Sequence, residues 1–387
     1  MESCELSIVM PCLNEEKTLP QCIAKAKSFL EKHNVHGEIV IADNGSTDHS
    51  REVAQEAGAR VVDVQERGYG SAILGGMAAA KGKYIIVGDA DDSYDFSSLS
   101  LFLEKLREGY DMVIGNRFQG GVMPGAMPFL HRYLGNPLLS WIGNLFFRSP
   151  IHDFHCGLRA VRADAVPTLD LHATGMEFAT EMVVKAIAHR LQMTEVPVVL
   201  YPDGREKRSH LRTWRDGWRH LRLLLLYSPN WIFLYPGIFF IITGGGVGLW
   251  LLPGQRYILD VHTLLYAAAL VILGVNALSC GLIAKVFAID AGLLPPTPLL
   301  KKVYGRYSLE IGVLVGFVLL CVGIGISAYA FWFWDRRQFS DLNPQQVMRM
   351  TIPAVTLILI GFQIIFSSLF LIVLRMQRVR HSSRSGK

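Results

Sequence analysis

Residues 84–93 read YIIVGDADDS, and this stretch decides the fold of the N-terminal half of the chain. The apolar run over 83–88 is typical of a buried strand. Asp89 and Asp91 follow it at alternate positions, with Ser93 two residues further on. Carboxylates at a strand end can bind a hard divalent cation through oxygen, and such a cation can bridge a diphosphate. A solvated acidic loop would have the same composition, so the stretch alone leaves both interpretations open.

The segments on either side of this stretch repeat the same pattern, in which a short apolar run is followed by polar residues. From residue 6 to about residue 201, short apolar runs alternate with amphipathic stretches, which predicts an α/β domain with a mostly parallel sheet. The strand-like runs are 6–10, 38–42, 60–64, 83–88 and 111–115. In open α/β sheets the ligand crevice lies outside the carboxyl ends of the strands. The polar residues that follow each run are therefore expected at one edge.

Two of these strand ends carry signals of their own. Asn14, followed by two glutamates, resembles a helix start, and Asp48 is placed to cap the next helix. The segment 42–48, ADNGSTD, suits the hydroxyls or base of a nucleoside, but an Asx turn with a helix cap explains it equally well. The glycines of 68–70 do not open the first βα unit, which argues against a dinucleotide-binding dehydrogenase.

Length and composition predict two structural units. The chain has 387 residues, of which 51% are hydrophobic, so one unit is expected in lipid. The six cysteines show no CxxC spacing, which argues against zinc and against a disulfide framework. The net charge of +5 is modest, and the basic residues lie beside apolar segments. This favours an anionic membrane surface over nucleic acid as a partner.

Four apolar segments in the C-terminal half are long enough to cross a bilayer. They are 231–252, 261–284, 308–334 and 352–374. Basic residues flank the middle pair and follow the last segment, although the connection over 335–349 carries three arginines. With no cleavable signal in the first fifty residues, the positive-inside rule predicts cytosolic termini and a cytosolic N-terminal domain. We expect a multi-pass protein of a bacterial inner (cell) membrane.

The stretch between these units predicts an amphipathic helix on the membrane surface. A row of apolar residues recurs at helical spacing beside a row of arginines. The apolar row is Leu211, Trp214, Trp218, Leu221 and Leu225. An ordinary domain helix with a solvated basic face is the alternative. The expected organisation is therefore a domain over 1–210, an interfacial helix over 211–230 and a membrane domain over 231–387.

Five segments in this order resemble the family-2 glycosyltransferases, and most closely the polyprenyl (dolichyl) phosphate hexose synthases. The segments are PCLNE (11–15), DNGS (43–46), DAD (89–91), GNR (115–117) and DFHCGLR (153–159). The resemblance spans residues 5–210. It implies a GT-A fold and an inverting transfer of a hexose from a nucleotide-sugar to polyprenyl phosphate.

The resemblance also implies roles for individual residues. Mg²⁺ or Mn²⁺ would be held by Asp89 and Asp91, with help from Ser93. Nucleotide-sugar contacts would come from Pro11, Asn14, Glu15, Asp43, Asp89 and Asp91. The acceptor phosphate would be bound by Arg117 and Arg132. A basic loop over 202–210 resembles the mobile loop that covers the donor, with Arg205 its best candidate. The residues expected to carry catalysis are Asp91, Arg117, Arg132, Asp153 and Arg205.

The expected chemistry rests on positioning and charge. A lipid phosphate is already anionic near neutral pH, so it can attack without a strong base. Asp153, Glu177 and Glu181 would orient the arginines or bind sugar hydroxyls. Asn44 stands where mannose synthases of this kind usually carry a second aspartate. The sequence looks more similar to bacterial dolichol-phosphate-glucose synthetases, so the expected donor is UDP-glucose, with GDP-mannose next. The expected partners are the donor, polyprenyl phosphate and membrane lipids, with no nucleic acid; a homo-oligomer is left open.

Two rival functions follow from the same architecture. A processive polysaccharide synthase also joins this kind of domain to membrane helices, but the Gln-x-x-Arg-Trp segment that such enzymes share is absent from the sequence. A non-catalytic scaffold or transporter with a nucleotide-sensing domain is the second rival. Its spans would need internal charges for a pathway, and few are present.

Overall fold

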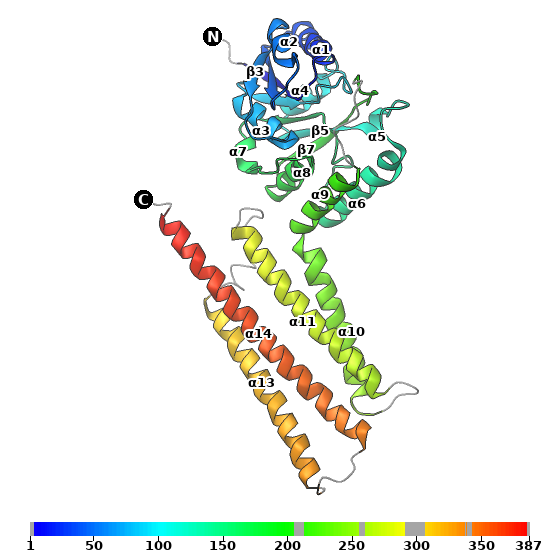
Figure 1. Cartoon of the computed structure of the whole chain (residues 1–387), viewed down its shortest axis with the longest axis vertical. Coiled ribbons are helices and arrows are strands. Elements are labelled where there is room, and N and C mark those ends of the chain that lie inside the picture. The colour runs from blue at the N-terminus through cyan, green and yellow to red at the C-terminus, as the bar shows by residue number, and fades with distance from the viewer. Residues whose placement is uncertain are drawn as a thin grey trace. The chain divides into compact units, whose positions relative to one another are not determined.

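The computed structural model describes residues 4–204, 213–254, 260–290, 306–336, 338 and 343–384. The chain divides into two compact units, Met1–Tyr227 and Ser228–Lys387. The first unit is the α/β domain and the second consists of helices (Figure 1). The contact boundary at residue 227 places the helix predicted over 211–230 largely in the first unit.

A seven-stranded sheet forms the centre of the first unit. The five runs predicted as strands are strands, which confirms the mostly parallel α/β class, and two further strands follow them. The strands are β1 (Leu6–Cys12), β2 (Gly37–Asp43), β3 (Arg60–Asp63), β4 (Tyr84–Val87), β5 (Met112–Asn116), β6 (Arg159–Arg162) and β7 (Met193–Pro197). The residues of β4 are all buried, as an unbroken apolar run requires.

The strand order, β3-β2-β1-β4-β6-β5-β7, determines which segments meet. All neighbouring pairs are parallel except those of β6, which runs antiparallel to β4 and β5. Val87, the last residue of β4, pairs with Arg159, the first residue of β6. The residues that precede β6 therefore lie at the same edge as the residues that follow β4. This reversed strand brings the segments 89–93 and 153–158 together.

Helices pack around this sheet (Figure 1). They are α1 (Leu19–Lys32), α2 (Ser50–Glu56), α3 (Tyr69–Ala79), α4 (Ser100–Arg107), α5 (Arg117–Gly120), η1 (His131–Gly135, a π-helical turn), α6 (Asn136–Phe147), α7 (Val166–Leu169), α8 (Phe178–Ala188) and α9 (Thr213–Leu226). Helix α3 contacts β1 and β2, and it lies close to them because Gly76 has no side chain. A Cβ added there would lie 2.4 Å from a methyl carbon of Val9.

The expected helix start at Asn14 is wrong. Asn14 has a left-handed backbone with φ of 59°, and α1 begins only at Leu19. The Asn14 side-chain oxygen instead accepts a hydrogen bond from the Thr47 N–H at 2.7 Å. Asp48 does serve the next helix, because its Oδ1 accepts from the N–H of Ser50, the first residue of α2. A polar link between the ends of β1 and β2 thus replaces the predicted helix start.

Among the residues of the second unit that the structure describes, four helices are long and apolar enough to span a membrane, as predicted. A π-helical turn, η2 (Asn230–Leu234), leads into the first of them. The helices are α10 (Tyr235–Leu251), α11 (Val261–Asp290), α13 (Arg306–Asp335) and α14 (Pro344–Arg384). The candidate spans are Asn230–Leu251, Val261–Ile289, Glu310–Asp335 and Pro344–Leu374.

Reciprocal glycine contacts bring these helices together in pairs. In the α10–α11 pair, a Cβ added at Gly237 would lie 3.0 Å from the Gly274 carbonyl oxygen, and one added at Gly274 would lie 2.7 Å from that of Gly237. In the α13–α14 pair, Gly316 and Gly361 show the same relation at 2.7 Å in both directions. Small residues at such crossings let helix backbones approach closely, which favours packing in lipid.

Candidate active site

A cavity of about 740 Å³ opens at the edge of the sheet where strands β1, β2, β4 and β5 end. Its volume lies within the range of small-molecule sites. Of the predicted site residues, those that line the cavity are Pro11, Glu15, Asp89, Asp91, Ser93 and Arg117. Those that do not line it are Asn14, Asp43, Arg132 and Asp153. Arg205 lies outside the described residues.

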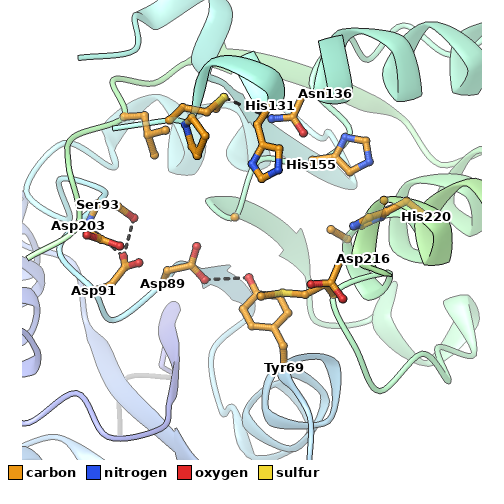
Figure 2. Close-up of a pocket in the computed structure, with 18 of the residues that line it drawn as sticks. Tyr69, Asp89, Asp91, Ser93, His131, Asn136, His155, Asp203, Asp216 and His220 are labelled. Atoms are coloured by element: carbon orange, nitrogen blue, oxygen red, sulfur yellow. Dashed lines mark hydrogen bonds between the residues drawn. The ribbon is translucent and has the colours of Figure 1, made fainter. Parts of the chain in front are cut away.

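The acidic residues after β4 form one side of this cavity (Figure 2). Asp91 Oδ1 accepts hydrogen bonds from the Ser93 hydroxyl at 2.6 Å and from its N–H at 3.1 Å. Asp89 Oδ1 accepts from the Tyr69 hydroxyl at 2.8 Å. Burial, together with the Asp89 charge, raises the Tyr69 pKa well above its ordinary value, so this phenol keeps its proton. Both carboxylates are held in fixed orientations by these donors.

The donor atoms of this edge suit a hard divalent cation. Asp89, Asp91 and Ser93 present only oxygen ligands, which Mg²⁺ and Mn²⁺ prefer. Within the part of the chain that the structure describes, no group of three or more His, Cys, Asp or Glu residues converges as a metal cage. Mg²⁺ is commonly bound by one or two carboxylates, with substrate phosphates and water completing its coordination. Two aspartates beside a large cavity fit this pattern.

The loop after β2 is held by its own side chains. The buried Asp43 carboxylate accepts from the N–H groups of Gly45 and Ser46, which is the Asx turn considered as one alternative. The Ser46 hydroxyl in turn accepts from the Asn14 N–H at 3.0 Å. Asp43 and Asn14 thus shape the loops beside the cavity, while Pro11 and Glu15 line it directly.

Asn44 has a structural reason to be an amide. Its Nδ2 donates to the carbonyl oxygens of Val64 and Glu66, and its Oδ1 accepts from the Gly68 N–H. An aspartate could accept from Gly68 but could not donate to the two carbonyl groups. The amide therefore fixes the segment 64–68 beside the cavity, and Gly68 begins the turn into α3.

Arg117 is buried in an ion pair with Asp153. Its Nε and Nη2 donate to the two Asp153 oxygens at 2.7 Å each, and its backbone N–H donates to Oδ2 at 3.1 Å. Asp153 is fully buried and its own N–H donates to Glu195 at 2.9 Å. The edge of the guanidinium that carries Nε and Nη2 is therefore already hydrogen-bonded to Asp153. Arg117 lines the cavity, but its fork faces Asp153.

Arg132 lies in the π-helical turn η1 and stacks on its neighbour. Its guanidinium carbon lies 5.4 Å from the centre of the Tyr133 ring. The adjacent His131 lines the cavity and points toward its centre (Figure 2). Burial and the Arg117 charge lower the pKa of His131 below its ordinary value. The turn thus presents His131 to the cavity, a residue that the sequence reasoning did not single out.

One face of helix α9 packs against the rest of the domain, and another face is exposed. Leu224 is buried and Asp216 and His220 are nearly so, whereas Trp214 is 84% exposed and Trp218 59% exposed. α9 contacts α6 and α8. Leucines of η1 and α6 line the cavity together with α9 residues: Leu134, Leu138, Leu139, Trp214, Trp218 and Leu221. One side of the cavity is therefore apolar.

Two histidines to which the sequence reasoning gave no role, His155 of the segment 153–159 and His220 of α9, lie on a further wall of the cavity. His155 and His220 are side by side (Figure 2), with ring centres 4.6 Å apart. The Thr180 hydroxyl lies 2.7 Å from His220 Nδ1 and 3.4 Å from His155 Nε2. For His220, the signal that could have revealed it was its spacing from Asp216, one helical turn earlier on the face of α9 that also carries the buried Leu224.

Glu177 and Glu181, whose roles the sequence left open, do not line the cavity. Glu181 accepts from the N–H groups of His172 and Ala173 and from the Tyr227 hydroxyl. It thereby ties the last residue of the first unit to the loop that precedes α8. Glu177 Oε2 lies 3.8 Å from an Arg219 nitrogen on α9. Glu177 thus lies beside α9, and Glu181 holds the residue that follows it.

Comparison with known proteins identifies the class to which this fold and site belong. Residues 7–170 match the model of glycosyl transferase family 2, and residues 282–375 match that of the glycosyltransferase family 2 C-terminal transmembrane region. The chain is 36% identical over 375 residues to the low-salt glycan biosynthesis hexosyltransferase Agl6 of Haloferax volcanii, covering 95% of this chain and 88% of that protein. The chain belongs to glycosyltransferase family 2, and its mostly parallel α/β domain is followed by the C-terminal transmembrane region of that family.

Other similar proteins cover less of the chain. A dolichyl-phosphate hexose transferase of Haloferax volcanii is 29% identical over 195 residues, which are 50% of this chain and 82% of that protein. A solved structure of glucosyl-3-phosphoglycerate synthase from Mycobacterium tuberculosis with Mn²⁺ and UDP-glucose covers 58% of this chain and 78% of its own, at 20% identity and a TM-score of 0.46.

Proposed function

We propose that this protein transfers a hexose from a nucleotide-sugar, preferably UDP-glucose, to the phosphate of a polyprenyl lipid. The observation that carries the proposal is a single cavity with a carboxylate edge at Asp89 and Asp91 and an apolar side on α6 and α9. Such a cavity suits a polar donor and a lipid acceptor together. The membrane helices of the same chain and its relative named a dolichyl-phosphate hexose transferase support a lipid acceptor.

The protein's own residues would act by positioning and charge. Asp89 and Asp91 would hold Mg²⁺ or Mn²⁺, and a cation bound there supplies positive charge to the leaving diphosphate. Pro11 and Glu15, which line the cavity, would contact the nucleotide, and Asn14 and Asp43 would hold the loops around it. Arg205 would cover the donor. The acceptor phosphate needs no strong base, so an aligned approach to the anomeric carbon is the main requirement.

The acceptor phosphate is assigned to Arg132 and Arg117. Arg132 is the stronger candidate, because two nitrogens of Arg117 already donate to Asp153. Arg117 would then act at the cavity wall through its charge and its remaining nitrogen, with Asp153 fixing its orientation. The catalytic domain and both termini would face the cytosol, where nucleotide-sugars are made.

The test is a donor panel with full-length protein in lipid nanodiscs. UDP-glucose, GDP-mannose, UDP-galactose and UDP-N-acetylglucosamine are offered with and without one polyprenyl phosphate, and lipid-linked sugar is measured by mass spectrometry. We expect fastest transfer from UDP-glucose and one hexose per lipid. Clear preference for GDP-mannose would overturn the donor assignment. A long polymer would indicate a processive synthase, and no turnover with any donor would indicate a non-catalytic scaffold or transporter.

The proposed metal site predicts the effect of Asp91→Asn. We expect this variant to lose nearly all transfer while its unfolding temperature stays close to that of the wild type. The asparagine oxygen can still accept from Ser93, so the loop is kept while the charge is lost. Asp164→Asn, at an exposed ion pair with Arg162, is the matched control. Full turnover of the wild type in excess chelator would remove the metal from the mechanism.

A further inference from the structure

The wall formed by His155, Thr180 and His220 has no role in the function proposed so far. His220 is 7% exposed, Thr180 is fully buried, and both histidines line the cavity. In Figure 2 they lie on one side, and Asp91, Ser93 and Asp203 lie on the other. The two imidazole rings meet edge to face, with an interplanar angle of 88°. Because α8 and α9 both contribute to this wall, its geometry is set by tertiary packing.

One atom of this wall requires a partner from the cavity. His155 Nδ1 is buried and has no hydrogen-bond partner among the described residues. A buried polar atom without a partner destabilises a fold, because it has lost its hydrogen bonds to water. Such an atom on the wall of a ligand-sized cavity points to a polar ligand group that satisfies it when bound.

The charge of the wall indicates what kind of group this is. Burial lowers the pKa of His155 well below its ordinary value, and the nearby His220, Arg117 and Arg159 lower it further. Arg159 is buried, and its guanidinium donates to backbone carbonyl groups such as that of Ala179 at 2.9 Å. Neutral imidazole offers one donor and one acceptor. This matches a hydroxyl group, which is also both, better than it matches a phosphate oxygen, which only accepts.

We propose that His155, Thr180 and His220 form the subsite for the hydroxyl groups of the transferred hexose, with His155 Nδ1 bonded to one of them. The inference rests on the proposed function and extends it to the sugar. It also revises the expectation that Asp153, Glu177 or Glu181 bind the sugar. Asp153 is paired with Arg117, and neither glutamate lines the cavity.

Thr180 acts in this subsite as a positioning residue. Its hydroxyl has one proton, so when it donates to one imidazole it can accept from the other. The two histidines are then coupled, and His155 and His220 present complementary donor and acceptor atoms to the sugar. Thr180→Val keeps the shape of the side chain but removes this coupling. We expect the variant to bind free nucleotide normally and to discriminate poorly among sugars.

The test uses full-length protein, the nucleotide-sugar that the wild type uses fastest, and its 2-, 3-, 4- and 6-deoxy analogues. For His155→Ala we expect kcat/KM with the parent donor to fall about tenfold, the effect of one neutral hydrogen bond. With the analogue that lacks the partner hydroxyl, wild type and variant should be equal. His155→Asn, which places a polar atom near the Nδ1 position, should restore part of the loss. Affinity for the free nucleoside diphosphate, measured by calorimetry, should not change.

The controls separate the subsite from stability and from the proposed function. His189→Ala, at an exposed position outside the cavity, should match the wild type throughout. Equal losses with the parent donor and every deoxy analogue, or a parallel loss of nucleoside diphosphate affinity, would show a purely structural role and overturn the subsite. Absence of transfer by the wild type from any donor is a different result, because it overturns the proposed function and the subsite with it.

Discussion

At the scale of single residues, burial decides what the charged groups of this cavity can do. Arg117 and Asp153 are both buried and satisfy one another, so their value to the site is geometric. Burial also lowers the pKa values of His155 and His220, so both imidazoles are neutral. The carboxylates after β4, which line the cavity, remain suited to a cation. Packing thus decides which of the polar motifs support the site and which face the ligand.

The buried His220 makes stability depend on pH in a defined direction. Burial lowers its pKa from 6.5 to about 4, partly opposed by Asp216. Because the unfolded state binds the proton more readily, the stabilisation is complete above pH 6.5 and is lost as the pH falls toward about 4. This difference in proton affinity between the folded and unfolded states corresponds to about 3 kcal/mol of stability. Thermal unfolding should therefore vary less with pH in this window for His220→Gln than for the wild type. A His189→Gln control should retain the wild-type dependence, and an unchanged slope in His220→Gln would contradict the prediction.

The two arginines assigned to the acceptor phosphate should behave differently when removed. Arg117→Ala leaves Asp153 buried without its partner and should destabilise the domain by about 3–5 kcal/mol. Arg132→Ala should leave stability nearly unchanged and should lower kcat/KM for polyprenyl phosphate roughly ten- to a hundredfold, the effect of losing a charge-assisted hydrogen bond.

Calorimetry with the nucleotide-sugar, alongside kinetics titrated in polyprenyl phosphate, measures this difference. Arg132→Lys should rescue only partly, because an ammonium group cannot reproduce the planar fork. If donor affinity collapses in Arg132→Ala while apparent acceptor affinity holds, Arg132 belongs to the diphosphate and the acceptor assignment is wrong.

At the scale of elements, α9 combines two functions that its sequence shows only in part. The tryptophans and arginines predicted an interfacial helix, and the tryptophans are exposed. Its other face, with Asp216, His220 and Leu224, packs toward the cavity and the domain. A polar pair among arginines looks like part of a solvated face, so only the packing with α8 reveals it. Its position at the membrane surface remains a prediction.

Alanine substitutions on the two faces of α9 should affect different properties, stability on one face and acceptor binding on the other. Leu224→Ala removes a fully buried side chain and should lower the free energy of unfolding by about 2–5 kcal/mol. Trp214→Ala alters an exposed residue and should leave unfolding within about 0.5 kcal/mol, while it raises the apparent KM for polyprenyl phosphate. Chemical unfolding and acceptor kinetics of both variants check this. A large loss of stability in Trp214→Ala would place that face against protein instead of lipid.

The strands show how far sequence patterns reach. The first five were predictable because each is an apolar run before a polar turn, which is typical of strands in an α/β sheet. β6 was not predicted, because its four residues begin with Arg159 and end with Arg162. Arg159 is nevertheless buried, because its guanidinium donates to backbone carbonyl groups. β7 is an edge strand with a glutamate at its centre, and that Glu195 supports Asp153. Contacts such as Arg117 with Asp153, 36 residues apart, require the fold.

At the scale of the whole molecule, the four candidate spans found among the described residues define a testable topology. An even number of crossings places both ends of the chain on one side of the membrane, and the basic residues after the last span favour the cytosol. Tags at both termini should be reached only from the cytosolic side, and a tag inserted at Gly254, after α10, only from outside. Protease protection in sealed vesicles of both orientations measures this. Termini exposed on opposite faces would require an odd number of crossings.

The reciprocal glycines of the membrane helices have a consequence for how this family diverges. At the α13–α14 crossing, Gly316 and Gly361 each fill the space that a side chain on the other would need. Gly237 and Gly274 stand in the same relation at the α10–α11 crossing. Replacement of one glycine in a pair removes the selective advantage of the other, because the helices must then separate in either case. Among relatives that share this membrane region, each pair should be inherited as a single character, retained together or lost together.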